Sequence, residues 1–267
     1  MEIRGKRVLL TGATGGLGRA IAKAMAADGA KLVLSSRKAE ELDALSAELP
    51  GSGHSTIVSD LAEDGAAVKL SAEAGDVDIL VANAALAGTG TLESFSPAEI
   101  ERAIRVNLDA PILMAQALMP AMKERGGGHI VFISSLSGKV ASPRGSIYNA
   151  TKFGLRGFAL ALREDQIVDR TGIGVSLVLP GFIRDAGMFA DGNADLPKGA
   201  GTASPEDVGA GVIKSITDDK AEVAVAPVGL KIGSAFAHVF PQVSARSQRK
   251  IARKVGDQLA EGNADKR

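Results

Sequence analysis

The sequence predicts an α/β protein in which helices cover both faces of a doubly wound parallel sheet of about seven strands, in a single domain. Short apolar segments alternate with longer segments of helical periodicity along most of the chain. A glycine-rich turn joins the first apolar segment to the first helical one, and glycine or proline ends several others. The 267 residues, 45% of them hydrophobic, suffice for a sizeable core.

The elements follow from these patterns. Strands are predicted at residues 7–11, 31–36, 56–59, 77–82, 129–134, 174–179 and 222–226. Helices are predicted at residues 19–28, 38–49, 96–125, 146–170 and 204–217. The helix at 96–125 begins with a capping box, Ser96 to Glu99, and has proline at its first position.

Composition excludes several kinds of site and partner. Lys plus Arg and Asp plus Glu both number 31, and this zero net charge argues against a nucleic-acid partner. The absence of cysteine excludes disulfides and thiolate chemistry, and His54, His129 and His238 lie too far apart in sequence to suggest a metal site. No apolar run reaches membrane-spanning length and none reads as a signal peptide, so a soluble, cytoplasmic protein is expected.

The glycine-rich turn indicates a dinucleotide site. Residues 12–18 (GATGGLG) lie between a predicted strand and a predicted helix, and a second strand follows. This is the context that a Rossmann-type fingerprint requires, because glycine lets the backbone approach a pyrophosphate and the helix N-terminus supplies amide donors. The spacing reads as T-G-x-x-x-G-x-G and, through Gly15, also as T-G-x-x-G-x-x-G, which point to two branches of one superfamily.

The residues after the second strand favour NADP(H) over NAD(H). Ser35, Ser36 and Arg37 stand where an acid would bind the adenosine ribose 2′-hydroxyl, and no carboxylate occurs before Glu40. An arginine with neighbouring hydroxyls matches a 2′-phosphate. NAD(H) is the alternative cofactor, and the plain alternative for Arg37 is a cap on a surface turn.

Tyr148 and Lys152 form a candidate catalytic pair. Tyr148 is the only tyrosine in the chain, and Lys152 follows it by one helical turn on the same face. An ammonium beside a phenol favours the phenolate, so we expect Lys152 to lower the pKa of Tyr148 and make it a proton donor and acceptor. Taken alone, such a pair is most often a surface tyrosine and a solvated lysine.

Two more polar residues support the pair. Asn107 lies four residues before Pro111, and proline deprives the Asn107 carbonyl of its normal donor, so a kink or a bound water is expected there. Ser135 follows a predicted strand, and a hydroxyl at the carboxyl end of a parallel strand faces the ligand crevice.

These motifs resemble those of the classical short-chain dehydrogenase/reductase family from about Arg7 to Ala226. The matching positions are TGATGGLG at 11–18, Asp60, Asn83-Ala84-Ala85, Asn107, Ser135, Tyr148 with Lys152, and Pro180-Gly181. The resemblance implies an NADP(H)-dependent oxidoreductase that moves a hydride between nicotinamide and a carbonyl or secondary alcohol. It implies that Tyr148 is the general acid/base, that Ser135 binds the substrate oxygen, and that Lys152 lowers the Tyr148 pKa and binds the nicotinamide ribose. Asn107 would hold a water of the proton relay.

The resemblance also implies the cofactor-binding residues, with the pyrophosphate passing along the glycine turn. The expected set is Gly12, Thr14, Gly15, Gly16, Leu17, Gly18, Ser36, Arg37, Asp60, Leu61, Asn83, Ala84, Tyr148, Lys152, Pro180, Gly181 and Ile183. Asp60 and Asn83 would contact adenosine. Two positions depart from the family pattern, since Ala85 replaces a usual glycine and Asp185 stands near a usual threonine.

The domain prediction places the catalytic and dinucleotide-binding domain at residues 1–226, with a mobile substrate loop at about 182–203, and a C-terminal helical extension at 227–267. Met188 and Phe189 in the loop favour an aliphatic or lipophilic carbonyl or alcohol as substrate. The basic residues of the extension are Arg246, Arg249, Lys250, Arg253 and Lys254. We expect them to form a solvated face or a subunit contact, with membrane-surface contact as the minor alternative. By the resemblance, the protein is expected to be a homodimer or homotetramer.

Two alternatives to the reductase stay open. The Gly15 spacing permits an extended-type nucleotide-sugar epimerase or dehydratase, although those chains are usually longer. A non-enzymatic sensor that binds a dinucleotide is the other, although such proteins often lose the tyrosine or lysine that this chain keeps. The sequence does not name the substrate or the direction of the reaction.

Overall fold

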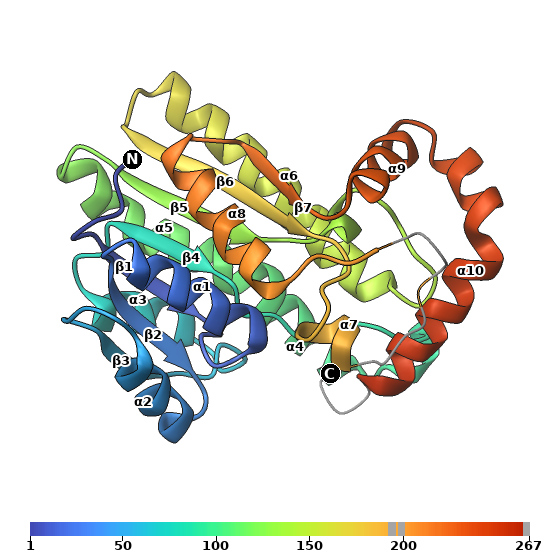
Figure 1. Cartoon of the computed structure of the whole chain (residues 1–267), viewed down its shortest axis with the longest axis horizontal. Helices are drawn as coiled ribbons and strands as arrows, with labels where there is room; N and C mark the ends of the chain where they lie inside the picture. Colours follow the sequence, from blue (N-terminus) through green and yellow to red (C-terminus); the bar gives the residue numbers. More distant parts are fainter. Residues whose placement is uncertain (192–195, 197–200, 264–267) are drawn as a thin grey trace.

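A seven-stranded parallel sheet forms the centre of the computed structural model, which describes residues 1–191, 196 and 201–263 (Figure 1). The strands are β1 (Arg7–Thr11), β2 (Lys31–Ser36), β3 (Ser55–Val58), β4 (Ile79–Ala82), β5 (Gly128–Ile133), β6 (Ile173–Pro180) and β7 (Glu222–Val225). Their order is β3-β2-β1-β4-β5-β6-β7, and every neighbouring pair is parallel. The predicted doubly wound sheet is therefore confirmed.

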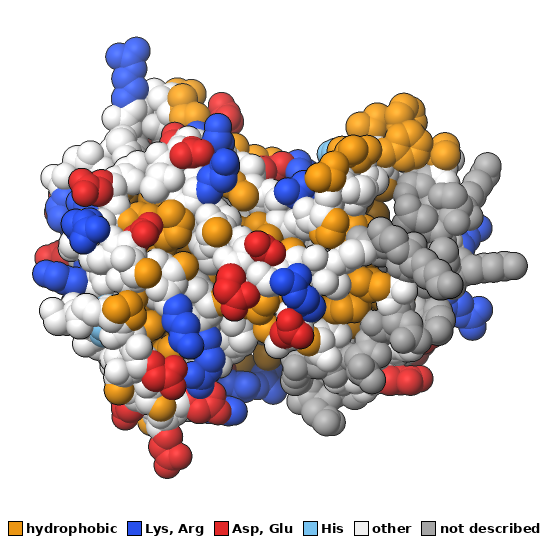
Figure 2. Space-filling view, viewed as in Figure 1, with side chains coloured by type: hydrophobic (Ala, Val, Ile, Leu, Met, Phe, Trp, Pro, Cys, Tyr) orange, Lys and Arg blue, Asp and Glu red, His pale blue; other side chains and the backbone are white. Residues whose placement is uncertain are grey.

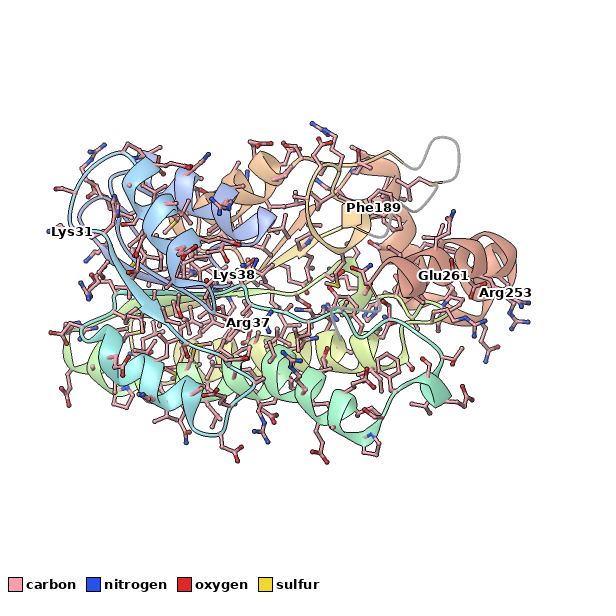
Figure 3. The ribbon with its side chains drawn as sticks, turned by 90° about the horizontal axis from the view of Figure 1, so that it is seen from below. Lys31, Arg37, Lys38, Phe189, Arg253 and Glu261 are labelled. Atoms are coloured by element: carbon pink, nitrogen blue, oxygen red, sulfur yellow. The ribbon has the colours of Figure 1, made fainter. Side chains whose placement is uncertain are left out.

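Helices cover both faces of the sheet, as Figures 1 and 3 show. One face carries α1 (Gly16–Ala27), α2 (Ala39–Glu48) and α8 (Pro205–Thr217), and the other carries α3 (Ala66–Ala74), α4 (Pro97–Ile104), α5 (Ala110–Glu124) and α6 (Ser146–Val168). Side chains alternate along each strand, so that Val8 and Leu10 pack in the core on the α1 side and Leu9 packs in the core on the α5 side. Because both faces are covered, the strands read as continuous apolar runs.

The single helix predicted over residues 96–125 is interrupted. The capping box at Ser96 and Glu99 is present, but α4 gives way to a π-helical segment at Arg105–Asp109 before α5 begins. The Ala110 amide donates to the Arg105 carbonyl, five residues back. The proline argument predicted a distortion near Asn107, and the distortion takes the form of a π-helical turn, a feature that is frequent at functional sites.

Helices α3 and α7 (Gly187–Asp191) lie outside the predicted helical ranges. Helix α3 is rich in small residues and buries Leu70, which gives it only a weak apolar period. Helix α7 lies in the predicted substrate loop, of which residues 192–195 and 197–200 are outside the described residues. A β-bridge between Ile183 and Ala203 joins the two ends of this loop.

Two helices follow the last strand, α9 (Val228–Val239) and α10 (Pro241–Gly262). They stand beside the carboxyl ends of the strands, at the right of Figure 1, where α10 contacts both α9 and α7. The side chains of Arg246, Lys250 and Lys254, which belong to the predicted basic face, lie outside the described residues. Among the helices that the structure describes, none is both long and apolar enough to cross a membrane.

Candidate active site

The glycine turn lies at the carboxyl ends of β1 and β4, where the strand order of the sheet reverses. Gly12 has a φ of +64°, and a Cβ there would lie 2.9 Å from the Cα of Ala84. A Cβ at Gly18 would overlap the carbonyl oxygen of Gly12. Both positions therefore require glycine for the close approach of β1, α1 and β4.

The start of α1 suits a pyrophosphate. Its N-cap, Gly15, offers no side-chain cap, and its first turn carries no acidic residue. The first amides of a helix have no partner within the helix, and the positive end of the helix dipole lies there. The backbone at Gly15 and Gly16 thus fits a dinucleotide phosphate, which is the cofactor group expected here.

Hydrogen bonds from Asn83 stabilise the glycine turn. Its Nδ2 atom donates to the carbonyls of Thr11 at 3.0 Å and Gly12 at 3.1 Å. The Thr11 hydroxyl oxygen accepts from the amides of Asn83 and Ala84, both at 3.1 Å. These bonds fix the end of β1 to the end of β4, and an adenosine contact by Asn83 stays a prediction.

Arg37 lies just after β2 with its side chain 54% exposed, and Figure 3 labels it beside Lys38. Its NH1 atom lies 3.9 Å from Oδ2 of Asp60, while Oδ1 of Asp60 accepts from the Ala62 amide at 3.0 Å. Asp60 thus caps the turn after β3 and holds Arg37 loosely. A half-exposed guanidinium with so long a contact is free to turn toward a phosphate.

Ser135, Tyr148 and Lys152 come together below the carboxyl end of β5. Lys152 is only 2% exposed, and its Nζ atom donates to the Ile133 carbonyl at 3.0 Å. The same Nζ lies 5.6 Å from the centre of the Tyr148 ring. The Ser135 hydroxyl lies close enough to the Tyr148 phenol to lower its pKa. The three residues therefore lie together near the end of β5, and their catalytic roles stay predictions.

The protonation of this group differs from the expectation. Burial raises the pKa of Tyr148 to about 12, an effect that the hydrogen bond from Ser135 only partly opposes. Burial also lowers the pKa of Lys152 to about 8. The lowered pKa that was expected for Tyr148 is not found, because removal from water disfavours the phenolate more than its neighbours favour it. At neutral pH the phenol is protonated and can donate its proton.

Asn107 is fully buried in the π-helical segment and ties two elements together. Its Oδ1 atom accepts from the Leu86 amide at 2.7 Å, and its Nδ2 atom donates to the Leu86 carbonyl at 3.0 Å. Nδ2 also lies 3.4 Å from the hydroxyl of Thr151, which donates to the Tyr148 carbonyl at 2.9 Å. Asn107 thus links the loop after β4 to α6, and its role in a water relay stays a prediction.

An apolar cavity of about 540 Å³ opens above Ser135 and Tyr148. Its walls are formed by Leu17, by Pro180 at the end of β6, and by Gly181 and Ile183 just after it. Its roof consists of residues from α7, α9 and α10, namely Met188, Phe189, Leu230, Gly233, Ala237, Val255 and Leu259. Figure 3 shows Phe189 on α7 beside the C-terminal helices. A ligand in this cavity meets hydrocarbon on most sides and hydroxyl groups at its floor.

The roof of the cavity was not predicted from the sequence. The residue pattern indicates a short amphipathic segment from Leu230 to Phe240 and a basic face after it, whereas the structure places one side of α9 and α10 against the cavity. Asn263 donates from Nδ2 to the Met188 carbonyl at 2.9 Å, and the Thr89 hydroxyl lies 3.4 Å from the Leu259 carbonyl. The available signal was the spacing of Leu230, Gly233 and Ala237 along one helix face.

The segment after β6 explains the departure at Asp185. Asp185 has a φ of +63°, and its side chain is 78% exposed beside Arg184. The next residue, Ala186, packs so closely on Gly16 that a Cβ there would overlap it. Asp185 therefore faces solvent, and Ala186 rather than Asp185 meets the glycine turn.

Comparison with known proteins decides the family. Residues 6–197 match the family model described as "short chain dehydrogenase". The chain belongs to the short-chain dehydrogenase/reductase family. Members of this family are NAD(P)-dependent oxidoreductases, and this chain is such an enzyme. No group of His, Asp and Glu that could hold a metal ion occurs among the residues that the structure describes.

Comparison with individual proteins is consistent with this family assignment. The chain is 36% identical over 229 residues to the ketoacyl reductase HetN of Nostoc sp., covering 84% of this chain and 79% of the relative. It is 38% identical over 193 residues to dehydrogenase/reductase SDR family member 7B of Bos taurus, covering 68% of this chain but only 59% of the relative. A solved short-chain dehydrogenase from Streptomyces avermitilis superposes with a TM-score of 0.76 at 26% identity, covering 95% of this chain and 99% of that one.

Proposed function

We propose that the enzyme is an NADPH-dependent reductase of ketones carried on an aliphatic or lipophilic chain. The observation that carries this proposal is the apolar cavity of about 540 Å³ with Ser135 and Tyr148 at its floor. The name of the relative from Nostoc sp., a ketoacyl reductase, supports a carbonyl on an acyl chain. Arg37, half-exposed at the end of β2, supports NADPH as the cofactor.

The residues of the site fit this reaction. The bound nicotinamide cofactor supplies the hydride. The Tyr148 phenol, protonated at neutral pH, donates its proton to the oxygen of the substrate carbonyl as that oxygen gains negative charge. The Ser135 hydroxyl donates a hydrogen bond to the same oxygen. Lys152, within 5.6 Å of the ring, then stabilises the tyrosinate until it is reprotonated.

Substrate orientation follows from the shape of the cavity. The carbonyl lies at the floor because the hydroxyl groups of Ser135 and Tyr148 satisfy it there, and a carbonyl left unpaired against the apolar roof residues would be destabilised. The alkyl chain lies against the roof residues of α7, α9 and α10. Each buried methylene contributes about 0.8 kcal/mol, roughly a fourfold gain in kcat/KM per carbon until the cavity is full.

We also propose a homodimer or homotetramer. Leu113 on α5 and Phe153 on α6 are each 38% exposed on the outer side of these helices, and Ile167 and Val168 at the end of α6 are 55% and 77% exposed. Packing this face against another copy would remove these side chains from water.

Turnover measured with purified protein tests the function. NADPH or NADH is mixed with methyl ketones and 3-ketoacyl thioesters of increasing chain length, and cofactor oxidation is followed by absorbance. We expect NADPH oxidation whose kcat/KM rises with chain length. Bound cofactor without turnover of any carbonyl would favour the sensor instead, and conversion of a nucleotide sugar without net cofactor oxidation would favour the epimerase.

A further inference from the structure

Helix α9 has a second apolar face, which points away from the cavity. Leu230, Gly233 and Ala237 line the cavity on its inner side. On its outer side, Val228, Ile232, Phe236, Val239, Phe240 and Val243 are 70%, 66%, 49%, 65%, 51% and 58% exposed. These six side chains, from α9 and the start of α10, form the outer α9 face. Figure 2 shows hydrophobic side chains gathered over α9 at the upper right of the molecule.

The outer α9 face is continuous. Val228, Ile232 and Phe236 follow at intervals of four residues, so they lie along one side of the helix. The rings of Phe236 and Phe240 have centroids 5.1 Å apart, and both remain about half exposed. Scattered apolar residues on a surface are ordinary, but a continuous apolar stripe marks a contact with another body.

The charge of the C-terminal segment that carries this face points to an anionic partner. Residues 227–256 contain six lysines or arginines, Lys231, Arg246, Arg249, Lys250, Arg253 and Lys254, and no aspartate or glutamate. The whole chain has zero net charge, so positive charge is concentrated in this segment. Arg249 and Arg253 are exposed, and Figure 3 shows Arg253 on α10. Asp257, whose Oδ2 atom lies 3.7 Å from Nε of Arg253, and Glu261 follow on the same helix.

We propose that α9 and α10 dock the protein on an anionic lipid surface. The outer α9 face would enter the boundary between headgroups and acyl chains, and the exposed Arg249 and Arg253 of α10 would pair with lipid phosphates. A second copy of the chain fits this face less well. A two-fold contact through α9 would bring two basic α10 helices close together, and their like charges would repel.

Docking would place a lipophilic substrate next to its cavity. One helix, about 10 Å across, separates the outer α9 face from the cavity, and its two sides carry the two sets of apolar residues. A ketone dissolved in the lipid would then reach the site without crossing water. This last consequence rests on the proposed function, whereas the docking itself does not.

Vesicle flotation of the full chain tests the proposal. Vesicles of phosphatidylcholine alone are compared with vesicles that also contain phosphatidylglycerol. Three variants accompany the wild type. Ile232→Ser/Phe236→Ser/Phe240→Ser removes apolar side chains of the outer α9 face, and Arg249→Gln/Arg253→Gln removes positive charge. Val68→Ser/Leu92→Ser is the matched control, because it removes comparably exposed apolar residues that belong neither to the outer α9 face nor to the proposed contact between copies.

We expect the wild type and the Val68→Ser/Leu92→Ser control to float with the anionic vesicles. The α9 variant should bind them at least tenfold more weakly, by roughly the loss of three inserted apolar side chains. The arginine variant should bind roughly tenfold more weakly, and salt should weaken wild-type binding. Circular dichroism and NADPH affinity should match the wild type in all variants, which would show that they fold.

Three results would overturn the proposal. One is that the wild type binds neither kind of vesicle, and another is that the α9 variant binds as tightly as the wild type. The third is that sedimentation shows a wild-type oligomer which the α9 variant dissociates, because a second copy would then cover the face. Flotation needs no turnover, so a failure of docking and a failure of the reductase assignment are told apart.

Discussion

Nε of Arg144 lies 2.6 Å from Oδ1 of Asp257, and this ion pair joins segments 113 residues apart in the chain. Arg144 lies in the loop just before the helix that carries Tyr148, and Asp257 lies on α10. Beside the pair, a Cβ at Gly256 would lie 2.6 Å from the Pro143 carbonyl, so the two segments are in close contact. The ion pair therefore connects α10, which forms part of the cavity roof, to the loop that precedes the Tyr148 helix.

Loosening this pair should weaken substrate binding more than folding. Arg144 and Asp257 are 32% and 39% exposed, so their pair contributes at most about 1 kcal/mol to stability. We expect Asp257→Asn to raise the KM for long-chain ketones several-fold with little change in unfolding free energy. Asp76→Asn is the control, since it breaks an exposed pair with Arg125, a residue that does not line the cavity. An unchanged KM in Asp257→Asn would contradict the role given to α10.

Filling the cavity from α9 should change chain-length preference. A Cβ at Gly233 would meet no atom within 4 Å, although this glycine lines the cavity, so a side chain there would enter open space. We expect Gly233→Leu to lower kcat/KM for long-chain ketones by at least about tenfold and to spare short ones. Gly157→Leu, at an open position on α6, should change neither. Equal losses for long and short substrates would show that the cavity does not hold the alkyl chain.

Reversing the charge at Arg37 should change cofactor preference. An aspartate at the end of β2 repels a 2′-phosphate and can accept a bond from a ribose 2′-hydroxyl. We expect Arg37→Asp to lower the ratio of kcat/KM for NADPH over NADH by at least about tenfold. Lys38→Ala, which removes a neighbouring charge paired with Glu41 at 2.6 Å, should leave the ratio nearly unchanged. An Arg37→Asp enzyme with the wild-type ratio would refute this basis for choosing NADPH.

Burial of Lys152 should make stability depend on pH. Its pKa is about 8 in the folded protein and 10.5 when unperturbed, so between these values the unfolded chain binds more protons. Folding stability should therefore rise with pH across this window and stay flat below it. Relative to Lys152→Met, which has no such charge, the wild type should gain up to about 3 kcal/mol between pH 8 and 10.5. Denaturant unfolding at several pH values measures this, and a difference that does not vary with pH would be inconsistent with a buried ammonium.

Much of the fold was predictable because local signals and global topology agree. Buried apolar runs and the glycine turn specify the parallel sheet, and Ser96 with Glu99 specifies the start of α4. The proximity of the candidate site residues was predictable for the same reason. Ser135 and Gly12 both follow parallel strands, and the carboxyl ends of these strands meet at one edge of the sheet. The π-helical turn at Asn107 was predictable only as a distortion, because proline removes a donor without dictating how the helix compensates.

Other features depend on packing that no local pattern reveals. The pKa of Tyr148 follows from its burial in the folded chain, and the helical spacing from Tyr148 to Lys152 carries no information about that burial. In the sequence, the apolar residues of α9 form one irregular amphipathic pattern. Only the position of α9 beside the cavity shows which of them line the cavity and which are exposed on the outer side. Helix α3 was not predicted, because its residues are mostly small and show only a weak apolar periodicity.

The proton-donor role of Tyr148 is the centre of this account, and one measurement tests it most directly. Hydride transfer from bound NADPH to a long-chain ketone is followed in a single turnover by the wild type and by Tyr148→Phe, which keeps the ring and loses the hydroxyl. General acid catalysis contributes about 10²- to 10⁴-fold, so we predict a loss of at least about 100-fold with NADPH affinity unchanged. A Tyr148→Phe rate within a few-fold of the wild type would contradict the account.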